Sequence, residues 1–338
     1  MMQPDALHSL PGPLLLLPFV FQLLAIAVMP FLAHHWWERH YPKVSLFLGG
    51  TTVLYYLLIL GRGGRLLEPL HEYVSFVILM ASLFIVAGGI HIGVSGEATP
   101  GKNVLFLLVG SVLASVIGTT GASMLLIRPW VRMNRYRITG FHTAFFIFLI
   151  ANVGGGLTPI GDPPLFLGFL KGVPFWWTME HLWRPWLLVV GLLVGIFYLI
   201  DRENFLRAPR AVREEETAEE HWAFEGLGNL LPLGAILFAV FFPSPWREIM
   251  MAAAAFLSWY LTPRLTHQKN DFSLAPIKEV AWLFLGIFAT MVPALDYLEH
   301  HAPQMAQSFG MGSLHFYYLT GILSAFLDNA PTYLAFLS

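Results

Sequence analysis

The stretch "ANVGGGLTPIGDPPLF", residues 151–166, interrupts an apolar run that is otherwise long enough to cross a bilayer as one helix. It contains four glycines, three prolines, an asparagine and an aspartate, and glycine and proline disfavour a continuous helix. Each backbone group that such a break frees costs on the order of several kcal/mol in hydrocarbon, so a break persists only where protein or water satisfies it. The stretch therefore predicts two half-helices that meet inside a membrane protein.

The order of residues in this stretch predicts where each half-helix ends and begins. Residues 141–152 form the first half, and the glycines at 154–156 are expected to end it in the left-handed conformation. Asp162 is the expected N-cap of the second half, with Pro163 at its first helical position. The predicted helix-breaking residues of this stretch are Gly154, Gly155, Gly156, Pro159, Gly161 and Pro163.

The composition indicates an all-α polytopic membrane protein. The 338 residues are 56% hydrophobic and 12% charged, with a mean hydropathy of +0.63, whereas soluble domains carry about 25% charged residues. The chain has no cysteine, which excludes disulfides, thiolate nucleophiles and cysteine-ligated metals. It also lacks a Walker loop, a Gly-x-Ser-x-Gly elbow and a His-Glu-x-x-His helix, so we expect neither an enzyme nor a bound cofactor.

About ten segments are long and apolar enough to be membrane spans. They are residues 14–32, 44–60, 73–92, 104–127, 141–170, 186–200, 227–242, 249–261, 280–298 and 314–338. The polar stretch 201–226 divides them into a first membrane half, 1–200, and a second half, 227–338. Within the first half we expect a hairpin at 104–138 and a broken helix at 141–170.

The distribution of arginine predicts the orientation in the membrane. Arginines gather in "IRPWVRMNRYR", residues 127–137, and at the start of the polar stretch 201–226. Short loops rich in Lys and Arg stay in the cytoplasm, so both segments, and with them the linker 201–226, are expected there. No Lys or Arg precedes the first apolar segment, which is therefore expected to be a retained helix rather than a cleaved signal.

A weak internal repeat relates the two halves. "VLASVIGTTGASMLL", from Val112, aligns without gaps to "ILSAFLDNAPTYLAF", from Ile322, and this sets residues 118–121 opposite 328–331. Paired breaks at corresponding places of two halves indicate the binding site of a secondary transporter. The further helix-breaking residues predicted from this alignment are Gly118, Gly121 and Pro331. A second-half counterpart of residues 151–166 would lie beyond Ser338, so we expect the chain to be a C-terminally truncated fragment.

Asp162 and Asp328 are the acids that these breaks contain, and they are the predicted ion- or proton-binding residues. An aspartate at membrane depth costs about 2.5 to 3.5 kcal/mol on insertion scales, although Ser or Thr would cap a helix almost as well. The acids are therefore expected to bind Na⁺ or H⁺, with helix capping as the alternative for Asp162. The exposed carbonyl end of one half-helix attracts cations, and the N–H end of the next attracts anions.

Neutral oxygen-bearing side chains flank both acids. Each can simply satisfy freed backbone groups, but as a set they supply the all-oxygen environment that a desolvated Na⁺ requires. The predicted members of this set are Asn152, Thr158, Thr119, Thr120, Ser123, Asn329 and Thr332. Glu279 and Asp296 lie near span ends and are expected to be interfacial. Hydrogen-bonded packing is expected for His91, His142 and His315, with a proton relay as the alternative.

Three segments together resemble the signature sequences of the ion transporter superfamily. These are "GTTGASMLLIRP" from Gly118, "ANVGGGLTPIGDPP" from Ala151 and "LDNAPTY" from Leu327. The resemblance is strongest to NhaD-type sodium/proton antiporters and the related citrate transporter family. It implies an inverted repeat with re-entrant hairpins, a homodimer in the bacterial inner membrane, and an elevator-like transport domain beside a scaffold domain.

Sodium/proton antiport is the function that this resemblance and the two acids predict first, with Asp162 and Asp328 alternately binding Na⁺ and H⁺. The alternative is transport of citrate or another organic anion, whose charge Na⁺, H⁺ or a divalent metal would have to neutralise beside these acids. Arsenite efflux, an ion channel and a non-transporting scaffold are the remaining alternatives. The expected partners are the lipid bilayer, Na⁺, H⁺ or citrate and a second copy of the chain, and no nucleic acid is expected.

Overall fold

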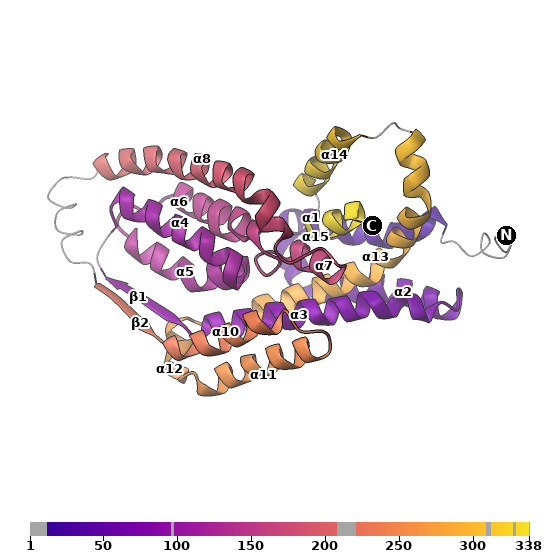
Figure 1. The fold of residues 1–338 in the computed structure, drawn as a ribbon, viewed down its shortest axis with the longest axis horizontal. Coiled ribbons are helices and arrows are strands. Elements are labelled where there is room, and N and C mark those ends of the chain that lie inside the picture. The colour runs from indigo at the N-terminus through magenta and orange to yellow at the C-terminus, as the bar shows by residue number, and fades with distance from the viewer. Residues whose placement is uncertain (1–11, 96–97, 208–220, 309–311, 327–328, 338) are drawn as a thin grey trace. The chain divides into compact units, whose positions relative to one another are not determined.

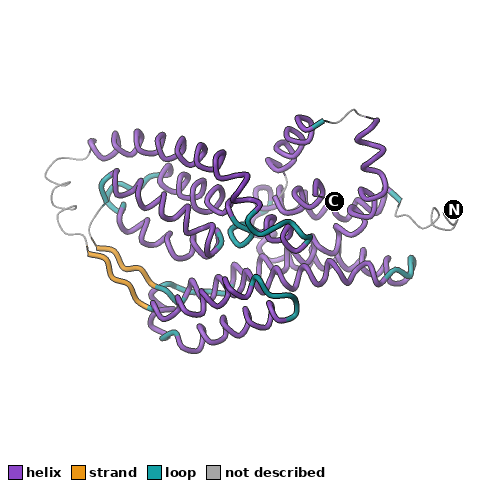
Figure 2. Tube along the Cα trace, viewed as in Figure 1, coloured by secondary structure: helices purple, strands orange, loops and turns teal. Residues whose placement is uncertain are grey.

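The computed structural model describes residues 12–95, 98–207, 221–308, 312–326 and 329–337. The chain divides into two compact units: unit 1 comprises residues 1–77 and 274–338, and unit 2 comprises residues 78–273. Helices make up most of each unit (Figure 1, Figure 2). The mostly helical membrane fold that the composition predicted is therefore confirmed.

Unit 1 contains helices from both ends of the chain. They are η2 (Pro13–Leu16), α1 (Leu17–Leu32), α2 (His34–Leu58), η3 (Gly63–Leu66), the first part of α3 (Leu67–Gly88), α13 (Ala275–Ser308), α14 (Ser313–Phe326) and α15 (Asn329–Leu337).

Small residues let α2 and α13 pack closely in unit 1. A Cβ added to Gly49 on α2 would lie 3.0 Å from the Cβ of Ala289, and one added to Gly286 on α13 would lie 2.8 Å from the Cβ of Ser45. Ser45 Oγ also accepts a hydrogen bond from Gln22 Nε2 at 3.0 Å, which ties α1 to α2. Close backbone approach and interhelical hydrogen bonds of this kind are typical of helix packing in membranes.

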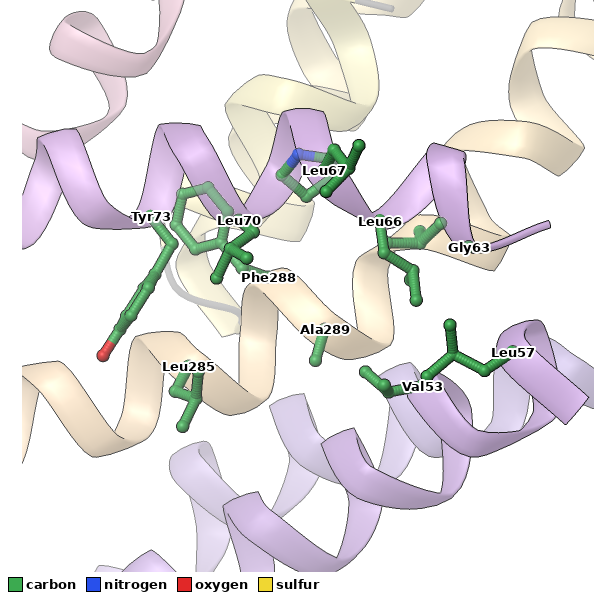
Figure 3. A pocket seen from close by; sticks show the side chains of 12 residues that line it. Val53, Leu57, Gly63, Leu66, Leu67, Leu70, Tyr73, Leu285, Phe288 and Ala289 are labelled. Carbon is green, nitrogen blue, oxygen red and sulfur yellow. The ribbon is translucent and has the colours of Figure 1, made fainter. Parts of the chain in front are cut away.

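An apolar pocket of about 290 Å³ lies in unit 1 between α2, the start of α3 and α13 (Figure 3). Val53 lines it from α2, Leu70 from α3 and Leu285 from α13. The only polar side chain among its lining residues is Tyr73, whose hydroxyl donates to the carbonyl of Ala281 at 3.0 Å. The pocket therefore offers no charged or amide group to bind an ion.

Unit 2 contains the remaining helices and a two-stranded sheet. Its elements are the rest of α3, β1 (His91–Ser95), α4 (Pro100–Ile117), α5 (Thr119–Met133), α6 (Gly140–Phe146), η4 (Ile147–Asn152), η5 (Val153–Leu157), α7 (Pro163–Leu170), α8 (Trp177–Arg207), β2 (His221–Glu225), η6 (Leu227–Asn229), α10 (Leu230–Ala239), α11 (Trp246–Leu261) and α12 (Arg264–Lys269).

The sheet is a departure from the all-α expectation. Strands β1 and β2 pair antiparallel, with His91 opposite Glu225 and Ser95 opposite His221 (Figure 2). Lys269 Nζ donates a hydrogen bond to Glu225 Oε1 at 2.5 Å, and this hydrogen bond lowers the pKa of the Glu225 carboxyl. The pairing joins segments about 130 residues apart, so no local pattern reveals it.

The predicted linker 201–226 has a different layout in the structure. Residues 201–207 continue α8, and residues 221–225 form β2. Residues 208–220 lie outside the described part of the chain. The two units also differ from the predicted halves 1–200 and 227–338, because each unit combines residues from both halves.

Within the described residues, six helices are long and apolar enough to span a membrane. They are Pro13–Leu32, Gly63–Gly88, Pro100–Ile117, Gly140–Leu157, Trp177–Arg207 and Ala275–Tyr297. Other predicted spans contain shorter helices, such as α10 with 10 residues and α14 with 14. The total of about ten membrane segments and the inverted repeat remain predictions.

Candidate functional site

A glycine separates α4 from α5 at the first predicted break. Helix α4 ends at Ile117 and α5 begins at Thr119, while Gly118 has φ +78° and ψ 151°. That backbone conformation is accessible almost only to glycine. A Cβ at Gly118 would also approach the carbonyl oxygen of Ile160 to 3.3 Å. The sequence therefore forms a helix–glycine–helix hairpin here.

The second predicted break is a gradual loss of helical structure followed by a restart. Helix α6 continues as a π-helix, η4, and then as a 3₁₀-helix, η5. π-Helical turns are rare and frequently occur at functional sites. The backbone is extended at Thr158 and at Asp162, and α7 begins at Pro163 as the sequence predicted. Asp162 holds the N-cap position of α7, but its side chain makes no capping hydrogen bond.

The reason predicted for the glycines at 154–156 is wrong. None of them has a positive φ, and they lie in η5. A Cβ at Gly156 would make only an ordinary contact, 3.6 Å from Trp186 Cδ1. Gly154 and Gly155 are needed because other atoms come close: a Cβ at Gly154 would lie 2.5 Å from the carbonyl oxygen of Leu149, and one at Gly155 would lie 2.5 Å from that of Gly161. Close approach between chain segments, rather than left-handed conformation, requires glycine at these positions.

The two breaks cross each other within unit 2. The backbone N–H of Thr119 donates to the carbonyl of Gly161 at 2.9 Å. Ser115 Oγ donates to the carbonyl of Gly154 at 2.5 Å, and Thr158 Oγ1 donates to the carbonyl of Ser115. We call residues 115–121 together with residues 153–163 the crossing.

Four helix ends meet at the crossing. The N-terminal ends of α5 and α7 carry partial positive charge, and the C-terminal ends of α4 and η5 carry partial negative charge. Half-helix N-termini bind anionic groups in membrane carriers, and unwound carbonyls bind cations. The arrangement can therefore hold an anion and a cation close together, with the Asp162 carboxylate at the start of α7.

Five predicted site residues of the first half lie on α5 or in the connection that precedes α7. Thr119 is buried, whereas Thr120, Ser123, Thr158 and Asp162 are half-buried. The Thr158 hydroxyl donates to the backbone carbonyl of Ser115, which is the role expected for a single threonine at such a break. Ser123 Oγ is buried and has no hydrogen-bond partner among the described residues, so its oxygen remains available to a ligand.

Several other predicted residues have different positions. Asn152 is exposed at the end of η4. Gly121 does not break a helix, because it lies inside α5, where a Cβ would meet the Cβ of Ala87 at 3.6 Å. Pro159 and Gly161 are buried in the turn between Thr158 and Asp162 that precedes α7.

The second-half site residues belong to unit 1. Asp328 lies outside the described residues, so its pairing with Asp162 is untested. Helix α14 ends at Phe326 and α15 begins at Asn329. Asn329 Oδ1 accepts a hydrogen bond from Ser324 Oγ, Thr332 is buried, and Pro331 lies in the first turn of α15.

A buried polar cluster in unit 2 was missed by the sequence reasoning. The Asp201 cluster comprises Asn103, Asn134, Arg137, His142 and Asp201, all less than a tenth exposed. Asp201 accepts from Asn103 Nδ2 at 2.9 Å, from His142 Nε2 at 3.1 Å and from both terminal nitrogens of Arg137. The sequence pattern placed Arg137 and Asp201 only within charged segments that are expected in the cytoplasm. An acid near the end of an apolar helix is the signal that could have indicated a buried partner.

His142 has a fixed role in this cluster. Its Nδ1 accepts the backbone N–H of Thr139 at 3.2 Å in a capping box at the start of α6. The neutral ring therefore carries its hydrogen on Nε2 and donates it to Asp201. This is the hydrogen-bonded packing that the sequence predicted for His142.

Asp296 is buried in the protein, near the end of the apolar helix Ala275–Tyr297. In unit 1 it accepts hydrogen bonds from Tyr56 Oη at 2.8 Å and from Arg65 Nε at 3.0 Å. Within the described residues, no group of three or more His, Asp or Glu side chains could hold a metal ion. The crossing is therefore the site that the remaining polar groups define best.

A multi-pass helical membrane protein with two broken segments crossing in its interior is the class that the fold and the site define. The chain belongs to the family described as "Putative citrate transport", whose model matches residues 8–338. The resemblance to a citrate transporter family is thereby confirmed.

Similar proteins occur in mycobacteria. "Uncharacterized transporter Rv2685" of Mycobacterium tuberculosis (strain ATCC 25618 / H37Rv) is 25% identical over 206 residues, which cover 59% of this chain and 48% of that protein. "Uncharacterized transporter Mb2703" of Mycobacterium bovis (strain ATCC BAA-935 / AF2122/97) is 25% identical over 205 residues, with the same shares covered. The chain thus spans about half the length of the curated relatives it matches, and no solved structure matches it significantly.

Proposed function

We propose that the crossing is the substrate site of a secondary active carrier that moves citrate or a related carboxylate together with Na⁺ or H⁺. The observation that carries this proposal is the contact between the two breaks, in which Thr119 N–H donates to the carbonyl of Gly161. It sets two helix N-termini and two carbonyl ends around one place in unit 2. A site with both polarities suits an anion that travels with a cation.

The assignment of roles follows from charge. The N-terminal end of α5 faces the substrate carboxylates, supported by the Thr120 hydroxyl. Asp162 and the Ser123 hydroxyl supply oxygen ligands for the coupling cation. The cation neutralises Asp162, which would otherwise repel a carboxylate. The family description also favours citrate over other anions.

Sodium/proton antiport is the second candidate, and Asp162 favours it. The acid occupies an N-cap without making a capping hydrogen bond, so capping does not account for it. In an antiporter this carboxylate would exchange H⁺ for Na⁺, and no anion would be bound. A carrier is favoured over a channel because of the predicted duplication of the two membrane halves.

Flux measurements in proteoliposomes distinguish these functions. We expect labelled citrate to accumulate when an inward Na⁺ or H⁺ gradient is imposed, and to stop when the gradient is abolished. Asp162→Asn should lose the dependence on the cation, whereas Glu180→Gln, an exposed acid on α8, should behave like the unmodified protein.

The antiport alternative predicts a different pattern in the same vesicles. Na⁺ or Li⁺ would then dissipate a preset pH gradient, reported by an entrapped dye, without any citrate present. That result, combined with no citrate uptake, would contradict the carboxylate proposal. Normal transport by Asp162→Asn would show that this carboxylate does not bind the coupling cation.

We also propose that the protein works as a homodimer in the bacterial inner membrane. The support is the resemblance to the ion transporter superfamily and the occurrence of its relatives in bacteria. Native mass spectrometry of protein extracted from that membrane should give twice the protomer mass, and a monomer mass would oppose the proposal.

A further inference from the structure

Arg247 and Glu248 form a buried charge pair in the first turn of α11. Their exposed fractions are 7% and 8%. Both Nε and Nη2 of Arg247 donate to Oε1 of Glu248, at 2.9 and 2.7 Å. A buried ion pair stabilises a fold little more than apolar residues of similar volume do, and ionisable residues buried in membrane proteins are commonly functional.

The pair lies against the helix that restarts after the break. The Arg247 guanidinium carbon is 5.8 Å from the centre of the Phe166 ring, and Phe166 is almost fully buried. A second aromatic contact, between Phe175 and Phe241 with ring centres 4.7 Å apart, also joins the α7 region to the α10–α11 hairpin. The contact between Arg247 and Phe166 is therefore part of a packed interface within unit 2.

Phe166 and Asp162 share one face of α7. They are four residues apart, and the backbone N–H of Phe166 donates to the Asp162 carbonyl at 3.2 Å. Large side chains in helices lean toward the N-terminus, so the Phe166 ring covers the first turn of α7. The Arg247 guanidinium therefore packs on α7 through Phe166, four residues along the chain from Asp162.

We propose that Arg247 is a substrate-binding residue that recognises a carboxylate of the transported anion, and that Glu248 holds the guanidinium when no anion is bound. This inference rests on the proposed function and names the group that selects its substrate. A guanidinium fork binds carboxylates through two parallel hydrogen bonds, so Arg247 can exchange the Glu248 carboxylate for a substrate carboxylate. The positive charge of Arg247 also offsets the negative charge of Asp162. The partial positive charges of the helix N-termini alone would offset that negative charge only in part.

The exchange predicts opposite effects for the two members of the pair. In proteoliposomes, Arg247→Gln should raise the KM for labelled citrate by about ten- to hundredfold, the usual range for losing a hydrogen bond to a charged group. Arg247→Lys, which keeps the charge but loses the fork, should fall between. Glu248→Gln removes the competing carboxylate and should lower the KM. A matched control is Arg184→Gln, because Arg184 also lies over an aromatic ring, that of Trp183, but is exposed.

A neutral double variant separates binding from folding. Single variants leave one buried charge without its partner, so they can lose stability. Arg247→Gln with Glu248→Gln removes both charges, and we expect it to express and melt like the unmodified protein while citrate no longer raises its melting temperature in detergent. Tricarboxylates should stabilise the unmodified protein more than monocarboxylates, and the double variant should not discriminate between them.

The outcomes distinguish failure of this inference from failure of the proposed function. If citrate is transported and the double variant retains the normal KM and thermal shift, Arg247 does not bind substrate and the pair is structural. A rise in KM for Glu248→Gln as large as that for Arg247→Gln would overturn the exchange in the same way. If citrate neither enters vesicles nor stabilises the unmodified protein, both proposals fail. Stabilisation by citrate that depends on Arg247, without uptake, would leave the binding role intact and reject transport.

Discussion

Gly118 shows how one residue without a side chain makes the crossing possible. Its φ of +78° and ψ of 151° turn the chain sharply between α4 and α5. The turn places the Thr119 N–H against the carbonyl of Gly161, which joins the two breaks. Any other residue here would strain the backbone and press against the carbonyl of Ile160.

We therefore expect Gly118→Ala to destabilise the protein by about 1–3 kcal/mol, the usual cost of this backbone conformation for a residue with a side chain. Thermal unfolding in detergent measures the change. Gly101→Ala, in the first turn of α4, is the matched control, since nothing lies within 4 Å of the added methyl group. Equal melting temperatures for the two variants would show that the turn at position 118 tolerates a side chain without strain.

At the residue scale, the sequence was informative where the cause is local. Asp162 and Pro163 begin a helix because of their own backbone preferences, and the structure places α7 there. The close contacts of Gly154 and Gly155 depend on chain segments that the sequence does not place side by side. The sequence therefore identified these glycines as necessary but attributed the need to the wrong conformation. Arg247 and Asp201 were missed for the same reason, because their partners lie on other elements.

At the scale of elements, the Asp201 cluster fixes the ends of four segments. Asn103 comes from α4, Asn134 and Arg137 from the turn after α5, His142 from α6 and Asp201 from α8. Helices α4 and α6 lead into the two broken segments that form the crossing. The cluster thus holds the hairpin and the broken helix to α8 as one body.

Removing one charge of this cluster leaves the other buried and unpaired. We expect Arg137→Gln or Asp201→Asn alone to cost about 3–5 kcal/mol. The double variant should recover part of that loss, because no uncompensated charge remains. Fluorescence-detected size-exclusion after heating measures the three variants side by side. A double variant as unstable as the sum of the singles would indicate that the two charges do not interact.

The linker illustrates what charge patterns predict about elements and what they leave out. The arginines and glutamates of residues 201–226 indicated a polar connection, but not that residues 221–225 pair with β1.

The predicted cytoplasmic location of the linker 201–226 is directly testable with Ala211→Cys, because the chain has no other cysteine. We expect the cysteine at position 211 to react with a membrane-impermeant thiol reagent in everted vesicles and not in intact cells. Labelling of intact cells alone would reverse the predicted orientation.

For the whole molecule, composition was sufficient to predict a helical membrane protein, and three short motifs were sufficient to predict the family. The division into units was not predictable in this way. Unit 1 joins residues 1–77 to residues 274–338, and unit 2 spans the predicted boundary between the halves. Contacts between distant segments set these units, whereas hydropathy reports only local character.

The same limit applies to the substrate. Acids at two breaks indicated a cation, and the sequence reasoning accordingly placed antiport first. The crossing adds two helix N-termini, which attract anions, and the buried pair of Arg247 and Glu248 packs against Phe166 on α7. Coupled movement of a carboxylate and a cation accounts for both kinds of group.

The central claim is that substrate binds at the crossing, and protection of a single cysteine there tests it most directly. Thr120→Cys places a thiol in the first turn of α5, and Arg135→Cys places one in the exposed turn after α5, outside the candidate membrane spans, as a control. We predict that citrate with Na⁺ or at low pH slows thiol labelling at position 120 and leaves the rate at position 135 unchanged. An unchanged rate at position 120 in protein that transports citrate would contradict the claim, because the substrate would then bind elsewhere.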